Sequence, residues 1–234
     1  MDNNEDKFEG IIGYTFNNIE LLKVALTHSS FANEHKLGKN KCNERLEFLG
    51  DAVLELVMSE YLYSSLMNVQ EGELTRKRAS IVCEPTLDLC AREIKLDEYI
   101  YLGHGEEITG GRKRASIVSD AFEAVIGAVY LDGGFTSAKE FIEKFVIDGI
   151  EDKTLFYDSK TILQEIAQGN NLGQVRYELV GESGPDHDKT FEVDLYIGDE
   201  KVGNGKGHTK KNAQQKAAYM AILRYRQVTG AKEK

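Results

Sequence analysis

The sequence predicts two domains, an all-α domain over about the first 150 residues and a small α+β domain with the order α-β-β-β-α after it. Apolar residues recur at three- and four-residue spacing through the first part, which is the period of a helix. Roughly alternating apolar residues, typical of strands, begin only at Val175. A length of 234 residues also suits two domains of roughly 100–150 residues better than one.

The helical period in the first domain predicts helices over residues 19–31, 44–66, 73–94 and 116–131. No strand-like alternation competes in these segments. The stretches between them are short and carry Gly, Asn or charged residues, as in HKLGKNK and NVQEG. This pattern favours a helical bundle.

The second domain is expected to begin with a helix in SKTILQEIAQG and to end with one in KKNAQQKAAYMAILRYR. Three strands are expected between them, in VRYELVGE, KTFEVDLYIG and KVGNGKG, with Gly and Pro residues in the gaps. We therefore predict a three-stranded antiparallel sheet. The expected boundaries are residues 1–151 and 159–228 for the two domains, a polar linker at 152–158 and a tail at 229–234.

The charge of the chain is unevenly distributed. A net charge of −10 argues at first against a nucleic-acid partner, because Lys and Arg drive phosphate binding. However, residues 201–234 hold nine basic residues against the single Glu233. The sequence therefore predicts a local surface that binds a polyanion on an otherwise acidic chain.

Two features bear on the cellular location. No apolar run is long enough to span a bilayer, and the acidic N-terminus MDNNEDKF does not resemble a signal peptide, so no membrane partner is expected. The three cysteines have neither C-x-x-C spacing nor a nearby pair of histidines, so neither a disulfide framework nor a zinc site is indicated. A cytoplasmic protein is expected.

Three carboxylates share one face of a predicted helix in NERLEFLGDAVLELV. Glu44, Glu47 and Asp51 fall at i, i+3 and i+7 and lie within about 60° of one another around the helix. Clustered carboxylates need protons, cations or metal to be tolerated, and oxygen ligands favour a hard ion such as Mg²⁺. The alternative is that Asn43 caps the helix while Glu44 and Glu47 favour its dipole.

A second acidic pair, Asp120 and Glu123, lies one turn apart in another apolar helix, and Gly127 leaves room beside it. The alternative is a capping box at a helix start. Acids at this spacing on two helices favour a metal site. A di-iron oxidoreductase would need Glu-x-x-His, and none of the five histidines has a Glu three positions before it. Two basic runs lie at residues 76–78 and 112–114. Their side chains could offset the acids of the candidate metal site, contact phosphate or be solvated.

These residues resemble a known family. NERLEFLGDAVLEL is similar to the signature segment of ribonuclease III, EGELTRKRASIV and SDAFEAVIGAVYLDGG resemble its next two blocks, and residues 157–226 resemble a double-stranded-RNA-binding domain. The resemblance implies an all-α N-terminal endonuclease domain followed by a small α+β (α-β-β-β-α) double-stranded-RNA-binding domain. It implies a homodimeric enzyme that cuts duplex RNA to 5′-phosphate and 3′-hydroxyl ends with short 3′ overhangs, in the processing of rRNA, tRNA and mRNA or the decay of regulatory RNA.

The resemblance also implies roles for individual residues. The metal ligands would be Glu47, Asp51, Asp120 and Glu123, with Asp51 and Glu123 also catalytic. Supporting acidic residues would be Glu44 and Glu71, and the residue at the subunit interface would be Phe48. The expected cofactor is Mg²⁺, two ions per site during cleavage, with Mn²⁺ able to substitute and no small-molecule cofactor.

The second domain supplies candidate RNA contacts. The shallow minor groove of A-form RNA is lined with 2′-hydroxyls, and helix N-termini favour phosphate. The candidates are Thr161, Gln164, Glu165, His187, Lys206, His208, Lys210 and Lys211. Helix capping by Thr161 and a solvated face for the lysines are the structural alternatives. The main functional alternative for the whole chain is a non-catalytic protein that binds duplex RNA.

Overall fold

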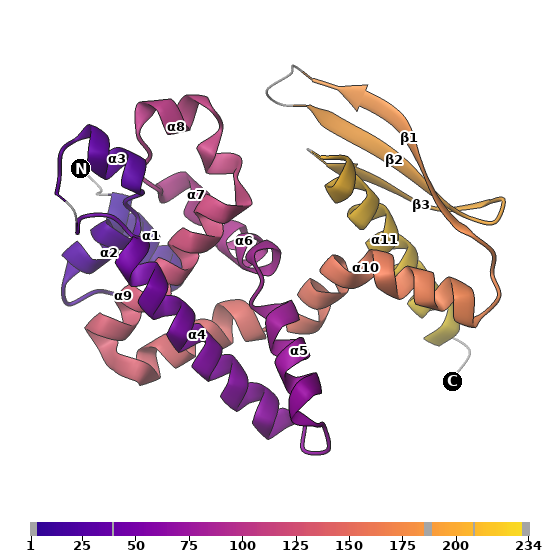
Figure 1. The fold of residues 1–234 in the computed structure, drawn as a ribbon, viewed down its shortest axis with the longest axis horizontal. Helices are drawn as coiled ribbons and strands as arrows, with labels where there is room; N and C mark the ends of the chain where they lie inside the picture. The colour runs from indigo at the N-terminus through magenta and orange to yellow at the C-terminus, as the bar shows by residue number, and fades with distance from the viewer. Residues whose placement is uncertain (1–3, 39, 185–188, 208, 231–234) are drawn as a thin grey trace. The chain divides into compact units, whose positions relative to one another are not determined.

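The computed structural model describes residues 4–38, 40–184, 189–207 and 209–230, without the side chains of 151–154, 156–158 and 226–230. The chain divides into two compact units, residues 1–150 and 151–234, which are described separately (Figure 1). Within the described residues, no helix has the length and apolar character needed to cross a bilayer. Cys42, Cys83 and Cys90 form no disulfide in the described part of the chain.

The first unit is helical, as predicted. Its longest helices are α4 (Glu44–Ser65) and α9 (Ala115–Ile142), which pack against each other (Figure 1). Their apolar faces fill the core with side chains such as Leu54, Met58 and Phe122, all fully buried. The other elements are α1 (Asn4–Ile12), α2 (Ile19–Ala25), α3 (Ser29–Glu34), α5 (Glu71–Ile81), α6 (Glu84–Glu93), α7 (Leu96–Tyr99), α8 (His104–Ile108), the 3₁₀ turn η1 (Gly111–Lys113) and the π turn η2 (Glu143–Ile147).

Two of the predicted helices are each divided in the structure. The segment 73–94 breaks between α5 and α6, where Pro85 occupies the first turn of α6, a position that needs no backbone N–H donor. The segment 19–31 breaks before α3, whose N-cap His28 accepts a hydrogen bond on Nδ1 from the Ser30 amide. Apolar spacing continues across both breaks, so periodicity alone missed them.

The second unit has the predicted order of elements. It contains α10 (Ile150–Gly169), β1 (Val175–Ser183), β2 (Thr190–Ile197), β3 (Glu200–Gly207) and α11 (Lys210–Gly230). The strands form an antiparallel sheet in the order β1-β2-β3, with a bulge in β1 between Leu179 and Gly181. Residues 152–158, expected as a linker, are helical and belong to α10, and no Gly or Pro in this stretch stops the helix.

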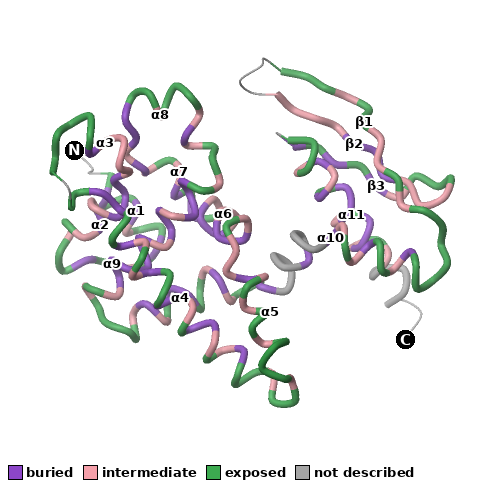
Figure 2. The backbone as a smooth tube through the Cα atoms, in the orientation of Figure 1, coloured by how far each residue is buried: buried purple, intermediate pink, exposed green. Residues whose placement is uncertain are grey.

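Glycines on β3 allow α11 to lie directly on the sheet. A Cβ added at Gly205 would come within 2.5 Å of the Ala217 amide nitrogen, and one at Gly203 would meet the Ala217 carbonyl oxygen. Leu163 on α10, Leu195 on β2 and Ile222 on α11 are buried and belong to a separate small core. Figure 2 colours the buried stretches of these elements purple. This close backbone contact between β3 and α11 sets the direction of α11 relative to the strands.

The two helices of this unit are joined by a buried hydrogen bond. The Ser159 hydroxyl is fully buried and donates to the Gln215 carbonyl oxygen at 2.9 Å. Next to it, the Lys160 ammonium donates to the Gln214 side chain at 2.7 Å. These contacts hold the N-terminal part of α11 against α10.

Candidate active site

Three carboxylates from two helices meet in the first unit. Glu47 on α4 and Asp120 and Glu123 on α9 each offer an oxygen within 4.8 Å of the others. All three side chains are half-buried. The donor set consists only of carboxylate oxygens, which suits a hard divalent cation that keeps some of its waters.

Two glycines bring these helices into backbone contact at the site. A Cβ at Gly50 would overlap the backbone carbonyl of Glu123, and one at Gly127 would meet the carbonyl oxygen of Leu46. The same hypothetical Cβ at Gly50 lies 2.9 Å from the Gly127 amide nitrogen. Only residues without a side chain fit at this crossing, and the close approach places Glu47 opposite the acids of α9.

The environment of Glu123 disfavours its charged form. Burial, and after it the negative charges of Asp51, Asp120 and Glu47, raise the pKa of Glu123 to about 8. Burial is also the main cause that raises the pKa of Glu47, again with help from the neighbouring acids. Within the described part of the chain, no Lys or Arg forms an ion pair with the three acids. A cation is therefore the natural partner of the cluster.

The pKa of Asp120 is raised as well, mainly by burial and then by the charge of Glu84. The charge of His28 and a hydrogen bond with Ser119 act in the opposite direction. Glu84 and His28 come from α6 and from the N-cap of α3. Sequence analysis missed both neighbours, because no spacing in the sequence links those segments to α9.

We expect the metal-free protein to lose stability as the pH rises from about 4.5 to about 8. In the folded state Glu123 keeps its proton up to a pKa of about 8, whereas in the unfolded chain the carboxyl ionises near 4.5. Between these values the folded state binds more protons, so the free energy of unfolding falls with increasing pH. Thermal denaturation in EDTA across this range measures the effect. An equally steep pH dependence in Glu123→Gln would contradict it.

Comparison with known proteins places this geometry in a family. Residues 18–150 match the family described as Ribonuclease-III-like, and residues 159–225 match the double-stranded RNA binding motif. The chain belongs to the ribonuclease III family. It is an endoribonuclease whose first unit is the nuclease domain and whose second is a double-stranded-RNA-binding domain.

Individual relatives support the assignment over the whole chain. Ribonuclease 3 of Caldanaerobacter subterraneus is 50% identical over 216 residues, which cover 90% of this chain and 93% of that protein. Ribonuclease 3 of Listeria monocytogenes is 44% identical, with 94% and 97% covered. The crystal structure of the ribonuclease III nuclease domain from Campylobacter jejuni is 42% identical, has a TM-score of 0.57, and covers 63% of this chain and 96% of that one.

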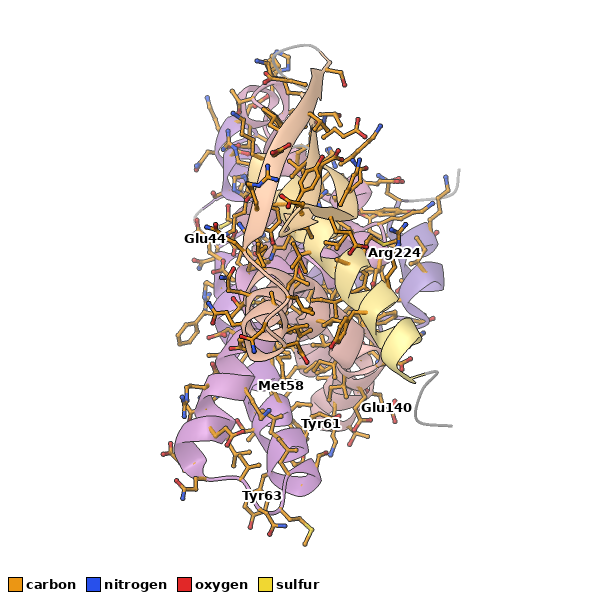
Figure 3. The ribbon with its side chains drawn as sticks, turned by 90° about the vertical axis from the view of Figure 1, so that its right-hand side faces the viewer. Glu44, Met58, Tyr61, Tyr63, Glu140 and Arg224 are labelled. Atoms are coloured by element: carbon orange, nitrogen blue, oxygen red, sulfur yellow. The ribbon has the colours of Figure 1, made fainter. Side chains whose placement is uncertain are left out.

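Two further acids expected at the ribonuclease III site lie beside the three carboxylates without joining them. Asp51 is exposed on α4 and is close enough for its charge to raise the pKa values of Glu47 and Glu123. Glu44 is exposed at the start of α4 and adds to the same effect on Glu47 (Figure 3). The charge of Asp51 therefore acts on two of the three carboxylates and that of Glu44 on one.

Glu71 lies elsewhere in the nuclease domain. It begins α5, which follows the C-terminal end of α4, and its carboxylate accepts a hydrogen bond from Thr75 at 3.1 Å (Figure 1). At about 1.5 Å per residue, α4 spans roughly 27 Å between Glu47 and Ser65. Within one chain, Glu71 is therefore not brought to the carboxylates, and a supporting role for it stays a prediction.

Phe48 is the first member of an exposed apolar stripe on α4. Its side chain is 80% exposed, and Leu56 and Tyr63, at 58% and 77%, follow it at helical spacing. Figure 3 shows Tyr63 near the opposite end of α4 from Glu44. Large apolar side chains gathered in this way mark an interaction surface.

The two basic runs of the nuclease domain pair with surface acids. Arg78 forms an ion pair with Glu55 at 3.1 Å, and Arg112 forms one with Glu107 at 2.7 Å. Arg114 pairs with Glu106 at 2.5 Å. The hypothesis that these arginines offset the acids of the site is therefore wrong, because each of the three pairs with a different acid.

The RNA-binding domain exposes most of the expected contact residues. Thr161, Gln164 and Glu165 are exposed on one side of α10. Lys210 and Lys211 are exposed at the N-terminal end of α11. Lys206 is exposed on β3 but forms an ion pair with Glu192 at 3.1 Å. His187 and His208 lie outside the described residues.

Proposed function

We propose that this enzyme is a Mg²⁺-dependent endonuclease that leaves 5′-phosphate and 3′-hydroxyl ends with short 3′ overhangs on duplex RNA. The observation that carries the proposal is the meeting of Glu47, Asp120 and Glu123 at the glycine crossing of α4 and α9. We further propose that it acts in the cytoplasm on structured precursors of rRNA, tRNA and mRNA and on regulatory duplexes.

The three carboxylates would hold the ion, with Asp51 as a fourth ligand from the exposed side. Bound Mg²⁺ supplies a Lewis acid that activates water and stabilises the leaving 3′-oxygen. Mn²⁺ also prefers oxygen ligands and is expected to substitute, and a second ion would be completed by RNA phosphate. Because its pKa is raised, Glu123 would give up its proton when it holds the ion. Glu47 and Asp120, fixed on packed helices, orient the site.

The rival function is a duplex-RNA-binding protein without activity. The complete set of carboxylates argues against it, because a protein that only bound RNA would be free to lose one of them. The test is incubation of a long RNA duplex with the protein and Mg²⁺, followed by mapping of the product ends. Intact RNA under conditions in which the protein binds it would refute the nuclease proposal.

The lysines that begin α11 are proposed to bind phosphate. We expect Lys210→Ala with Lys211→Ala to weaken binding to all duplex sequences and to lower the salt slope of the association constant by about one per lysine. The measurement is fluorescence anisotropy at several salt concentrations without Mg²⁺. Lys216→Ala, which removes one positive charge further along α11, is the control and should leave both quantities nearly unchanged.

The exposed stripe on α4 is proposed to form the contact between two copies of the chain. In the similar nuclease domain of ribonuclease III from Campylobacter jejuni, structural flexibility occurs in a region involved in dimer formation. Phe48→Glu would place a negative charge in this apolar contact. Burying an unpaired carboxylate there would oppose association of the two copies. We expect the variant to sediment as a monomer at concentrations where the unmodified protein is a dimer. An unchanged sedimentation coefficient would remove Phe48 from the interface.

A further inference from the structure

A cavity in the nuclease domain shares no lining residue with the carboxylate site. It has a volume of about 400 Å³, within the range of roughly 300–1,000 Å³ that is typical of small-molecule sites. It lies among α1, α2, α3 and the segments that follow α3 and α7. The lining residues are Glu5, Glu20, Lys23, Val24, Thr27, Phe31, Leu37, Lys41 and Tyr101.

The inner end of this cavity is rich in hydrogen-bond acceptors. Glu5 is only 3% exposed, and its Oε1 accepts a hydrogen bond from the Tyr101 hydroxyl at 2.9 Å. Its Oε2 is buried and has no hydrogen-bond partner among the residues that the structure describes. The Thr27 hydroxyl already donates to the Lys23 carbonyl oxygen at 2.6 Å, so it can offer only lone pairs. A ligand that fits here must present hydrogen-bond donors at its inner end.

The walls and the mouth of the cavity define the rest of the ligand. Val24, Phe31 and Leu37 give apolar contact along the sides. At the mouth, Lys23 is paired with Glu20 at 2.7 Å, while exposed Lys41 has no ion pair with any described residue. The ligand should therefore have a flat apolar body and an anionic group at its outer end.

We propose that this cavity binds a guanine mononucleotide. The Watson–Crick edge of guanine carries two neighbouring N–H donors, which suit a carboxylate that can only accept. The corresponding edge of adenine places an acceptor nitrogen where guanine has a donor, so it would face the Glu5 oxygens unfavourably. The purine ring supplies the flat apolar body, and the 5′-phosphate reaches toward Lys41.

The test is calorimetric titration of the full-length protein with GMP, AMP and guanosine, without Mg²⁺ or RNA. We expect GMP to bind at least about tenfold more tightly than AMP, since an unfavourably paired carboxylate loses a charge-assisted hydrogen bond. Glu5→Gln keeps an acceptor for Tyr101 and should weaken GMP binding by at least about tenfold. Asp6→Asn, an exposed change at the next position of α1, is the matched control and should bind GMP normally.

A second variant keeps the proposal testable if Glu5→Gln does not fold. Lys41→Ala is at the surface and should weaken the binding of GMP but not of guanosine. Equal affinity for GMP and AMP, no binding of either, or unchanged GMP binding in Glu5→Gln would overturn the proposal. Binding should persist in Glu123→Gln, so the result is independent of catalysis.

Discussion

Glu123→Gln is expected to reduce the rate of duplex cleavage by more than about 100-fold, the upper limit for losing a residue that only supports a metal ligand. The amide keeps the shape of the side chain but not its negative charge. Glu123 is the most strongly perturbed acid of the site, with a pKa raised to about 8, so at neutral pH a bound cation would favour its ionised form. Single-turnover cleavage at saturating protein measures the loss.

Two further measurements distinguish a role of Glu123 as a metal ligand from a purely structural role. Duplex binding without Mg²⁺ should be unchanged, because we expect the RNA-binding domain to supply most of the affinity. The metal-free variant should also be more stable than the unmodified protein above pH 8, since a desolvated carboxylate is gone. Glu140→Gln, exposed on the same helix 17 residues further along (Figure 3), is the control and should cleave normally. Lost RNA binding or a lower melting temperature would instead make Glu123 structural.

Gly50→Ala is expected to destabilise the nuclease domain by about 1–3 kcal/mol, the usual effect of an overpacked contact. The new methyl group would overlap the backbone carbonyl of Glu123, so α4 and α9 would have to separate. The same shift would move Glu47 away from Asp120 and Glu123. We therefore expect a higher Mg²⁺ requirement for cleavage as well as a lower free energy of unfolding, measured by urea denaturation and Mg²⁺ titration.

Gly10→Ala is the matched control for this substitution. Gly10 lies in α1, and a Cβ there would meet nothing within 4 Å. Alanine at an open helical position should be neutral or stabilise by up to about 1 kcal/mol. If Gly50→Ala were as stable and as active as Gly10→Ala, the glycine crossing would not determine the position of the carboxylates.

Much of the fold could be predicted because it depends on local patterns. The helical period of residues 44–66 and the three alternating stretches from Val175 each reflect which faces of an element are buried. The observed α4 and the three strands agree with those segments within a residue or so. The breaks before α3 and α6 were missed because a buried apolar period can continue across a change of direction.

The candidate site could be predicted only in part. The spacing of Glu44, Glu47 and Asp51 placed all three on one face of a helix, but it could not distinguish the half-buried Glu47 from its two exposed neighbours. That difference depends on which side of α4 meets α9. Likewise, the sequence indicated that Gly127 leaves space beside the acidic pair. Only the structure shows that the backbone of α4 at Leu46 fills this space.

The sequence by itself determined the two domains, the order of elements in the second and, through the family, the kind of enzyme. Only the tertiary structure decided which carboxylates meet. Glu47 and Asp120 are 73 residues apart in the chain, and no local period links them. They meet because Gly50 and Gly127 let two backbones touch, and the resulting burial gives Glu123 its raised pKa and its need for a cation.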